Sequence, residues 1–219
     1  MYICVVAKYK EDITWTQKLD CQVVIVNKDP DDQRFDVNYE NIGRETETFI
    51  RWIVDNYGNL KLDDKIIFLQ GNPFDHLTFE KFSEFVPIKG QKHKTSHLPQ
   101  AVRGRWSYCC QKKVLINYPD GTCIDLKIEP DPMLPWNQTI LVADYIGLPN
   151  FDYLISHTGG QWVVPVRYIL NKSKSWWEKA LTVHYNFDEP QLTANGYCIE
   201  RLWEMIWYHS DLEKQYVKK

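Results

Sequence analysis

The sequence has no long apolar run. No segment approaches the ~18 consecutive apolar residues that a membrane-spanning helix needs. The amino terminus, residues 1–7, is too short for the apolar region and cleavage site of a signal peptide, and charged residues follow it at once. We therefore expect a cytoplasmic protein with no membrane span.

Paired cysteine motifs are also missing. The six cysteines form no C-x-x-C pair, and the adjacent Cys109 and Cys110 do not make a metal knuckle. Cys4 lies in an apolar strand pattern, where a reduced thiol behaves as a small hydrophobic side chain. A reducing compartment is the simpler interpretation. The net charge of -3 argues against a general nucleic-acid binder, which needs a basic surface.

Several signatures of phosphate-binding and hydrolytic enzymes are absent as well. There is no G-x-x-x-x-G-K phosphate loop, no G-x-G-x-x-G dinucleotide fingerprint and no G-x-S-x-G elbow of a serine hydrolase. Aromatic residues, in contrast, are abundant, with 9 Trp, 13 Tyr and 9 Phe. Such rings stack on sugars and bases in binding clefts, and they also fill cores.

The order of the expected elements predicts an α/β fold. Short apolar runs predict buried strands at residues 2–7, 21–26, 66–69 and 162–164. Expected helices lie at residues 13–19, 78–85, 139–146, 165–170, 176–181 and 193–208, with another between Glu45 and Gly58. Pro119-Asp-Gly121 predicts a hairpin. We expect a single domain, residues 1–219, with a mostly parallel sheet of about six strands flanked by helices and a hairpin insertion.

Two of the expected helices have further sequence features, a spacing of charged residues in one and an N-cap residue in the other. Between Glu45 and Gly58, Glu47, Arg51 and Asp55 are spaced as an i, i+4 ladder on the face opposite the apolar residues. Ser175 is placed to cap the helix at 176–181. The basic segment 88–105 lacks periodicity and is expected to be a long surface loop.

The turn after the strand at 66–69 is the first candidate site. Residues 70–76 read Gln-Gly-Asn-Pro-Phe-Asp-His, so several ligand-binding side chains follow a buried strand directly. In open α/β sheets, ligands bind beyond the carboxyl ends of the strands. The alternative is a polar turn that caps the next helix, with Asp75 or Thr78 as the N-cap.

The segment before the next helix is the second candidate. Gly43 precedes that helix and leaves room for an anion at its free N–H groups, with Arg44 beside them. A phosphate site is one interpretation. The other is a simple turn in which Arg44 pairs with Glu45 or Glu47.

Four short motifs resemble a little-characterised family with a glycosyltransferase-type, GT-A-like nucleotide-sugar fold. They are Val5-Val-Ala-Lys-Tyr-Lys-Glu-Asp-x-x-Trp15, Asn41-Ile-Gly-Arg-Glu45, Phe68-Leu-Gln-Gly-Asn-Pro-Phe-Asp-His76, and Gly159-Gly-Gln-Trp-x-Val164 with Glu200-Arg-Leu-Trp203. The resemblance spans residues 2–208, and the third motif is the most specific.

The resemblance implies binding roles by position. Residues that would bind the nucleotide sugar are Tyr9, Glu11, Asn41, Gly43, Arg44, Gln70, Asn72 and Gln161. Transferases of this fold usually carry Asp-x-Asp where this chain has Gln70-Gly-Asn72. Amides are poorer ligands than carboxylates for a hard cation. Either Asp75 and His76 hold the metal, which is expected to be Mn²⁺ before Mg²⁺, or cations such as Arg44 and those of the 89–105 loop neutralise the diphosphate.

Glycosyl transfer with inversion also needs a base on the acceptor hydroxyl. Glu200 is the preferred catalytic residue, and Asp75 or Glu204 are the alternatives; the other interpretation of Glu200 is a solvated glutamate near a helix start. His157 is expected to be structural.

The leading hypothesis is a glycosyltransferase that moves a sugar from a nucleoside diphosphate sugar to a hydroxyl of a glycan or protein acceptor. A non-catalytic binding module of the same fold, favoured by the amides of Gln70 and Asn72, is one alternative. A nucleotidyltransferase is another.

Overall fold

The computed structural model describes residues 1–75, 77–102, 105–108, 114–117, 123–126, 136–149, 154–157, 160–185 and 196–208. The strands are β1 Tyr2–Lys8, β2 Gln22–Asn27, β3 Val37–Asn38, β4 Lys65–Gln70, β5 Gln100–Ala101, β6 Arg105–Tyr108, β7 Val114–Asn117, β8 Cys123–Leu126, β9 Leu154–His157 and β10 Trp162–Pro165. The helices are α1 Arg44–Asn56, α2 Phe79–Ser83, α3 Trp136–Tyr145, α4 Val166–Leu170, α5 Lys174–Thr182 and a last helix at residues 196–208. Short 3-10 helices lie at Thr14–Lys18, Tyr57–Asn59 and Pro73–Asp75.

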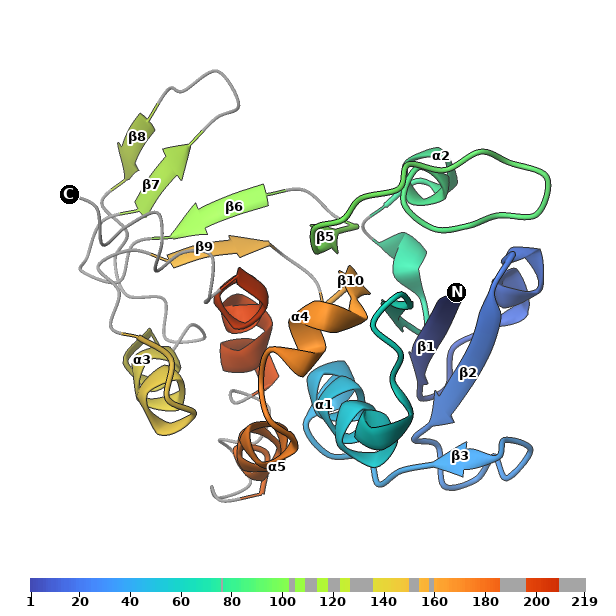
Figure 1. The fold of residues 1–219 in the computed structure, drawn as a ribbon, viewed down its shortest axis with the longest axis horizontal. Helices are drawn as coiled ribbons and strands as arrows, with labels where there is room; N and C mark the ends of the chain where they lie inside the picture. The colour runs from blue at the N-terminus through green and yellow to red at the C-terminus, as the bar shows by residue number, and fades with distance from the viewer. Residues whose placement is uncertain are drawn as a thin grey trace.

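A six-stranded sheet with the order β3-β2-β1-β4-β10-β5 forms the centre of the fold (Figure 1). Strands β1 to β4 pair in parallel, whereas β10 is antiparallel to both β4 and β5. The prediction of an α/β fold with a mostly parallel sheet of about six strands is confirmed. Strands β7 and β8 pair antiparallel on either side of the predicted turn, which confirms the hairpin.

The strand order reverses at β1. From β1 the chain runs outward through β2 to β3, and then returns through α1 to β4 on the other side of β1. The register pairs Ala7 with Gln70, so the carboxyl ends of β1 and β4 lie level with each other. In sheets of this kind a reversal of strand order opens a crevice beyond these carboxyl ends.

The sheet is buried on both faces because its side chains alternate. On β1, Val5 and Ala7 face the core cluster that contains α1, α4, α5 and helix 196–208, whereas Cys4 and Val6 face the cluster that contains Phe82 of α2. Figure 1 shows α2 on one side of the strands and α1, α4 and α5 on the other. Apolar residues at consecutive positions are therefore what this sheet requires.

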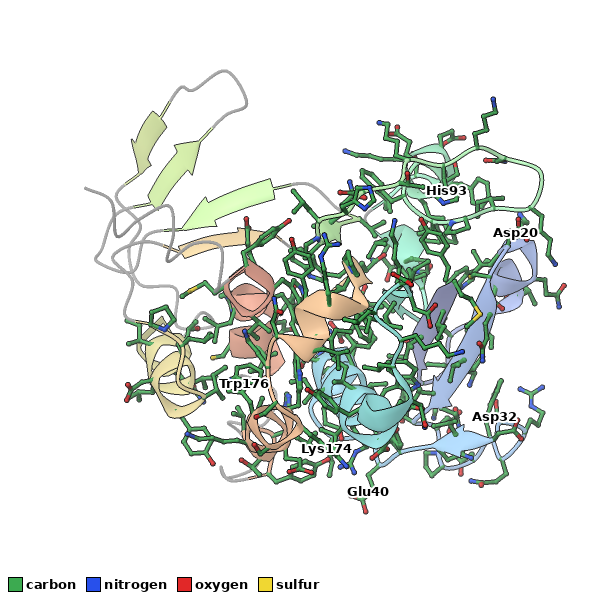
Figure 2. The ribbon with its side chains drawn as sticks, viewed as in Figure 1. Asp20, Asp32, Glu40, His93, Lys174 and Trp176 are labelled. Atoms are coloured by element: carbon green, nitrogen blue, oxygen red, sulfur yellow. The ribbon has the colours of Figure 1, made fainter. Side chains whose placement is uncertain are left out.

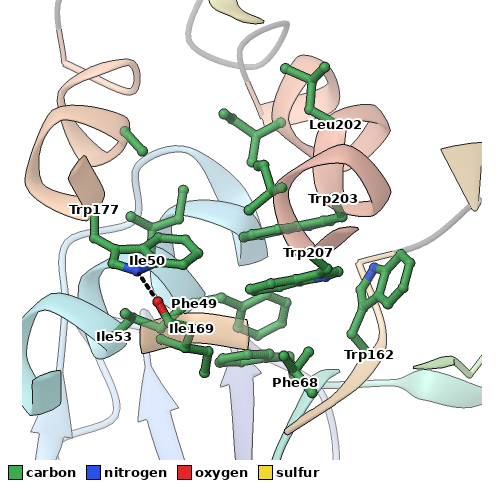
Figure 3. Close-up of a cluster of buried hydrophobic side chains, with 14 of the residues drawn as sticks. Phe49, Ile50, Ile53, Phe68, Trp162, Ile169, Trp177, Leu202, Trp203 and Trp207 are labelled. Atoms are coloured by element: carbon green, nitrogen blue, oxygen red, sulfur yellow. Dashed lines mark hydrogen bonds between the residues drawn. The ribbon is translucent and has the colours of Figure 1, made fainter. Parts of the chain in front are cut away.

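Indole rings fill the core on the α1 side (Figure 3). Trp207 stacks on Trp203 at 4.8 Å between ring centroids, and on its other side it stacks on Phe68 of β4 at 6.2 Å. Trp177 is fully buried and donates from Nε1 to the Ile169 carbonyl at 3.0 Å. These tryptophans serve the packing of the domain rather than a stacking cleft.

The Glu47–Arg51 pair of the predicted ladder forms, at 2.6 Å between Arg51 Nε and Glu47 Oε1. Lys28 also contacts Glu47 from the end of β2, and the carboxylate is buried. The predicted N-cap of α5 is wrong. Helix α5 begins at Lys174, with Ser173 as the N-cap in place of Ser175; the Ser173 hydroxyl accepts from the Trp176 N–H at 3.2 Å. The expected helix at residues 13–19 is a 3-10 helix, Thr14–Lys18.

Across the residues that the structure describes, no helix combines the length and the apolar character needed to cross a membrane. His76, the side chain of His157 and residues 193–195, on which earlier expectations depended, lie outside the described part of the chain.

Candidate functional site

A polar cavity of about 310 Å³ opens where β1, β2 and β4 end. We call it the strand-end cavity. Tyr9 and Glu11 line it from the loop after β1, Asn41 and Arg44 from the segment that enters α1, and Gln70, Asn72 and Asp75 from the turn after β4. All of these were predicted site residues, and segments far apart in the sequence bring them together.

The cavity also contains residues that the sequence analysis did not select. They are Ala7, Lys8, Lys28, Glu45 and Gly71. The signal that could have identified both lysines is their position: Lys8 ends β1 and Lys28 follows β2. The carboxyl ends of neighbouring parallel strands converge on one crevice.

Lys28 joins β2 to the start of α1. Its buried Nζ donates to the carbonyl of Ile42, to the carbonyl of Arg44 at 2.8 Å and to Glu47 Oε2 at 2.7 Å. Burial lowers the pKa of the Lys28 ammonium, and the Glu47 carboxylate opposes that change. These bonds use the three donors of the ammonium, so Lys28 positions the backbone of Arg44.

Lys8 is held in a similar way at the end of β1. Its buried Nζ donates to Asp32 Oδ2 at 3.1 Å, to Asn27 Oδ1 at 3.4 Å and to the Tyr9 carbonyl at 2.9 Å. Asp32, labelled in Figure 2, lies beside β3. Lys8 therefore connects the cavity with the outer edge of the sheet.

Arg44 has a more exposed side chain than the other two cations of the cavity, Lys8 and Lys28. Its backbone has φ +58°, a conformation that costs a non-glycine residue about 1–3 kcal/mol. Its guanidinium lies 4.7 Å over the Tyr197 ring and donates to the Tyr197 hydroxyl. Burial lowers the pKa of Arg44, but Glu45, Tyr197 and Glu200 together raise it above its ordinary value. Arg44 therefore remains charged.

Gly43 lies next to Arg44 but does not line the cavity. It is buried, and a Cβ built on it would meet His184 Nδ1 at 2.5 Å and Glu47 Cβ at 2.7 Å. With φ +61°, its backbone also favours glycine. In this structure the space beside Gly43 is filled by His184.

The turn after β4 both caps the next helix and contributes to the cavity wall. The Thr78 hydroxyl caps α2 by accepting from the Lys81 N–H at 3.4 Å. Asn72 donates to Asp75 Oδ1 and accepts from the Phe74 N–H at 3.2 Å, so both of its amide groups are used inside the turn. Asp75 is exposed and lines the cavity.

Gly71 lines the cavity where the loop after β4 packs closely against the loop after β1. A Cβ on Gly71 would lie 2.5 Å from Glu11 Oε2, so a larger residue here would displace that carboxylate. Glu11 Oε2 also accepts from the Tyr9 N–H at 2.6 Å.

Gln161 and the two helix glutamates lie outside the cavity wall. Gln161 is fully buried, and its Nε2 lies 3.4 Å from Gln70 Oε1. Glu200 is half-buried on helix 196–208, near enough for its charge to raise the pKa of Arg44. Glu204, the alternative base, is buried.

The metal prediction rests on Asp75 and His76. Asp75 is at the cavity, whereas His76 is outside the described residues. Within the described part of the chain, no group of three or more His, Cys, Asp or Glu side chains is placed to hold an ion. The Asp75–His76 pair stays a prediction.

A second groove, of about 660 Å³, lies at the opposite ends of the strands. It is larger, and its walls include Ile3, Val24, Trp52 and Asp55. We favour the strand-end cavity as the functional site in spite of its smaller volume, because ligands of open α/β sheets bind at the carboxyl ends of the strands.

Comparison with known proteins gives a family match. A model of the family described as "Protein of unknown function (DUF3431)" matches residues 3–218. No curated protein and no solved structure matches the chain. The description of this family names no activity.

Proposed function

The chain belongs to the DUF3431 family of proteins of unknown function, and from its strand-end cavity we propose that it is a nucleotide-sugar-dependent glycosyltransferase. The cavity would take the donor, a nucleoside diphosphate sugar. The acceptor would be a hydroxyl of a glycan or a protein.

The observation that carries this proposal is the place of the cavity. It lies at the carboxyl ends of β1 and β4, where the strand order reverses, and it collects side chains from the ends of three parallel strands. Doubly wound sheets bind nucleotides at such a point.

The charges of the cavity support a ligand that carries both phosphate and hydroxyl groups. Lys8, Lys28 and Arg44 line it together with the carboxylates of Glu11, Glu45 and Asp75. A simple polyanion would meet repulsion from the three carboxylates, whereas hydroxyl groups can donate to them. A phosphorylated sugar matches this mixture better than a bare phosphate does.

In the proposed reaction, Arg44 faces the diphosphate. The leaving group gains negative charge as the bond to the sugar breaks, and a positioned guanidinium stabilises that charge. Arg44 is suited to this because Lys28 fixes its backbone and its side chain remains half-exposed beside the cavity.

Glu200 is the proposed base. It would accept the proton of the acceptor hydroxyl while the donor occupies the cavity. Helix 196–208 brings Glu200 to the Arg44 side of the site, since its charge acts on that guanidinium. The acceptor would then approach from this helix.

A divalent ion would neutralise the diphosphate if Asp75 and His76 hold one, and Mn²⁺ suits a carboxylate–imidazole pair. The described residues do not by themselves form a metal site.

A non-catalytic binding module of this fold is the second candidate. It is favoured by Asn72, whose amide is engaged inside its own turn where transferases of the proposed fold carry a metal-binding carboxylate.

The test is a thermal-shift and calorimetric panel of nucleoside diphosphates and nucleoside diphosphate hexoses, with and without Mn²⁺. Arg44→Ala should weaken diphosphate binding by about 10- to 100-fold, because a charge-assisted hydrogen bond is lost. Arg167→Ala, an exposed arginine on α4, is the control and should bind as the wild type does. If no nucleotide binds at millimolar concentration, the proposal fails.

A further inference from the structure

Glu45 is held differently from the other carboxylates of the strand-end cavity. Glu11 and Asp75 accept hydrogen bonds from residues of their own loops. Glu45, in the first turn of α1, accepts at Oε1 from Gln70 Nε2 of β4 at 3.0 Å. Its side chain is only 10% exposed. A separate strand therefore fixes this carboxylate.

A buried amide orients Gln70 in turn. Gln161 is 1% exposed, and its Nε2 lies 3.4 Å from Gln70 Oε1 and 3.4 Å from the Pro73 carbonyl. Because Gln161 donates a hydrogen bond to the side-chain oxygen of Gln70, the amide nitrogen of Gln70 is directed toward Glu45.

A glycine makes the space for this arrangement. A Cβ on Gly160 would approach Glu45 Cγ to 3.1 Å, which is tighter than an ordinary contact. The segment before β10 thus supplies both the buried amide, Gln161, and the room for Glu45. No ligand is needed to hold the carboxylate in place.

Glu45 also keeps acceptor capacity. Gln70 engages Oε1, and Oε2 lies 3.6 Å from Arg44 Nε, which is an ion pair beyond hydrogen-bond distance. A carboxylate has about four lone-pair sites. Beside phosphate this group is repulsive, whereas beside a hydroxyl it is a strong acceptor.

We propose that Glu45, positioned by Gln70 and Gln161, is the residue with which the strand-end cavity recognises hydroxyl groups of the donor sugar. The inference rests on the proposed function and specifies that Glu45 binds the sugar part of the donor. Gln161 is then a positioning residue without contact to the ligand.

The experiment is calorimetry with UDP against UDP-glucose and GDP against GDP-mannose. For the pair that binds the wild type, Glu45→Gln should weaken the hexose conjugate by about 10- to 100-fold. Binding of the free diphosphate should not weaken, because the variant removes a negative charge beside Arg44. Glu178→Gln, the same change on the exposed face of α5, is the matched control and should alter neither.

A double-mutant cycle identifies the contact. Deoxy analogues of the hexose lose one hydroxyl each, and the analogue that lacks the hydroxyl bound by Glu45 should bind wild type and Glu45→Gln alike. If every analogue loses the same affinity for wild type as for Glu45→Gln, Glu45 does not bind a hydroxyl group of the sugar.

A second variant covers the case in which Glu45→Gln does not fold. Gln161→Met removes the buried amide outside the cavity and should weaken the hexose conjugate several-fold, again without effect on the diphosphate. Equal weakening of both ligands would overturn the inference and leave the proposed function standing. Absence of binding by every nucleotide would remove both.

Discussion

His184 gives the sharpest test of the packing around the site. It is fully buried beside Gly43, and neither of its ring nitrogens has a hydrogen-bond partner among the described residues. Burial lowers its pKa to about 4; Glu47 opposes this effect, whereas Lys28 and Arg51 add to it. The imidazole is therefore neutral in the folded protein at pH 7.

The sign of the pH dependence follows from these values. An exposed histidine in the unfolded chain has a pKa near 6.5. Below pH 6.5 the unfolded chain takes up a proton that folded His184 does not, so stability falls until pH reaches about 4. Between pH 7 and pH 5 the loss is about 2 kcal/mol. Glu47, whose pKa is lowered from 4.5, loses its contribution only below this window.

The assay is urea unfolding of wild type and His184→Leu at pH 7, 6 and 5. The difference in unfolding free energy should shift by about 2 kcal/mol in favour of the variant as pH falls. His97→Gln, which removes an exposed imidazole, is the control for loss of a histidine in the same assay. Parallel pH profiles for wild type and His184→Leu would refute the reasoning.

Three further variants test other parts of the account. Gly43→Ala should cost at least about 2 kcal/mol, because it adds a clash to a left-handed backbone, whereas Gly58→Ala, with open space around it, should be close to neutral in the same unfolding assay. Asp75→Asn should remove most of any gain that Mn²⁺ gives to diphosphate binding, and identical calorimetric titrations in Mn²⁺ and in chelator would show that the ion is dispensable. Glu200→Gln should lower turnover by at least about tenfold with nucleotide binding unchanged, and normal turnover would move the base to Asp75 or Glu204.

The sheet could be predicted because its strands are buried on both faces. Such strands are short, continuous apolar runs, and β1, β2, β4 and β10 agree with the predicted ranges to within one or two residues. Once their ends are known, the parallel-sheet rule brings the polar residues after β1 and β4 into one crevice. The turn after β4 was predicted from that rule, whereas Tyr9 and Glu11 after β1 were expected from the family resemblance.

The parts that could not be predicted depend on contacts between distant segments. Glu47 forms the expected i, i+4 pair with Arg51, but its burial depends on Lys28, which contacts it from the end of β2. Gly43 fits an anion-binding turn until His184 occupies the adjoining space. The sequence predicts Glu45 as a possible ion-pair partner of Arg44. In the structure Gln70 and Gln161 also orient Glu45, and no local sequence pattern indicates these contacts.

The central claim is that the strand-end cavity is the nucleotide-sugar site. A crystal structure with a nucleoside diphosphate hexose tests it most directly. The account predicts the diphosphate within hydrogen-bond distance of Arg44 and the hexose beside Glu45. An ordered ligand in the groove at Trp52, or in any place outside the strand-end cavity, would contradict it.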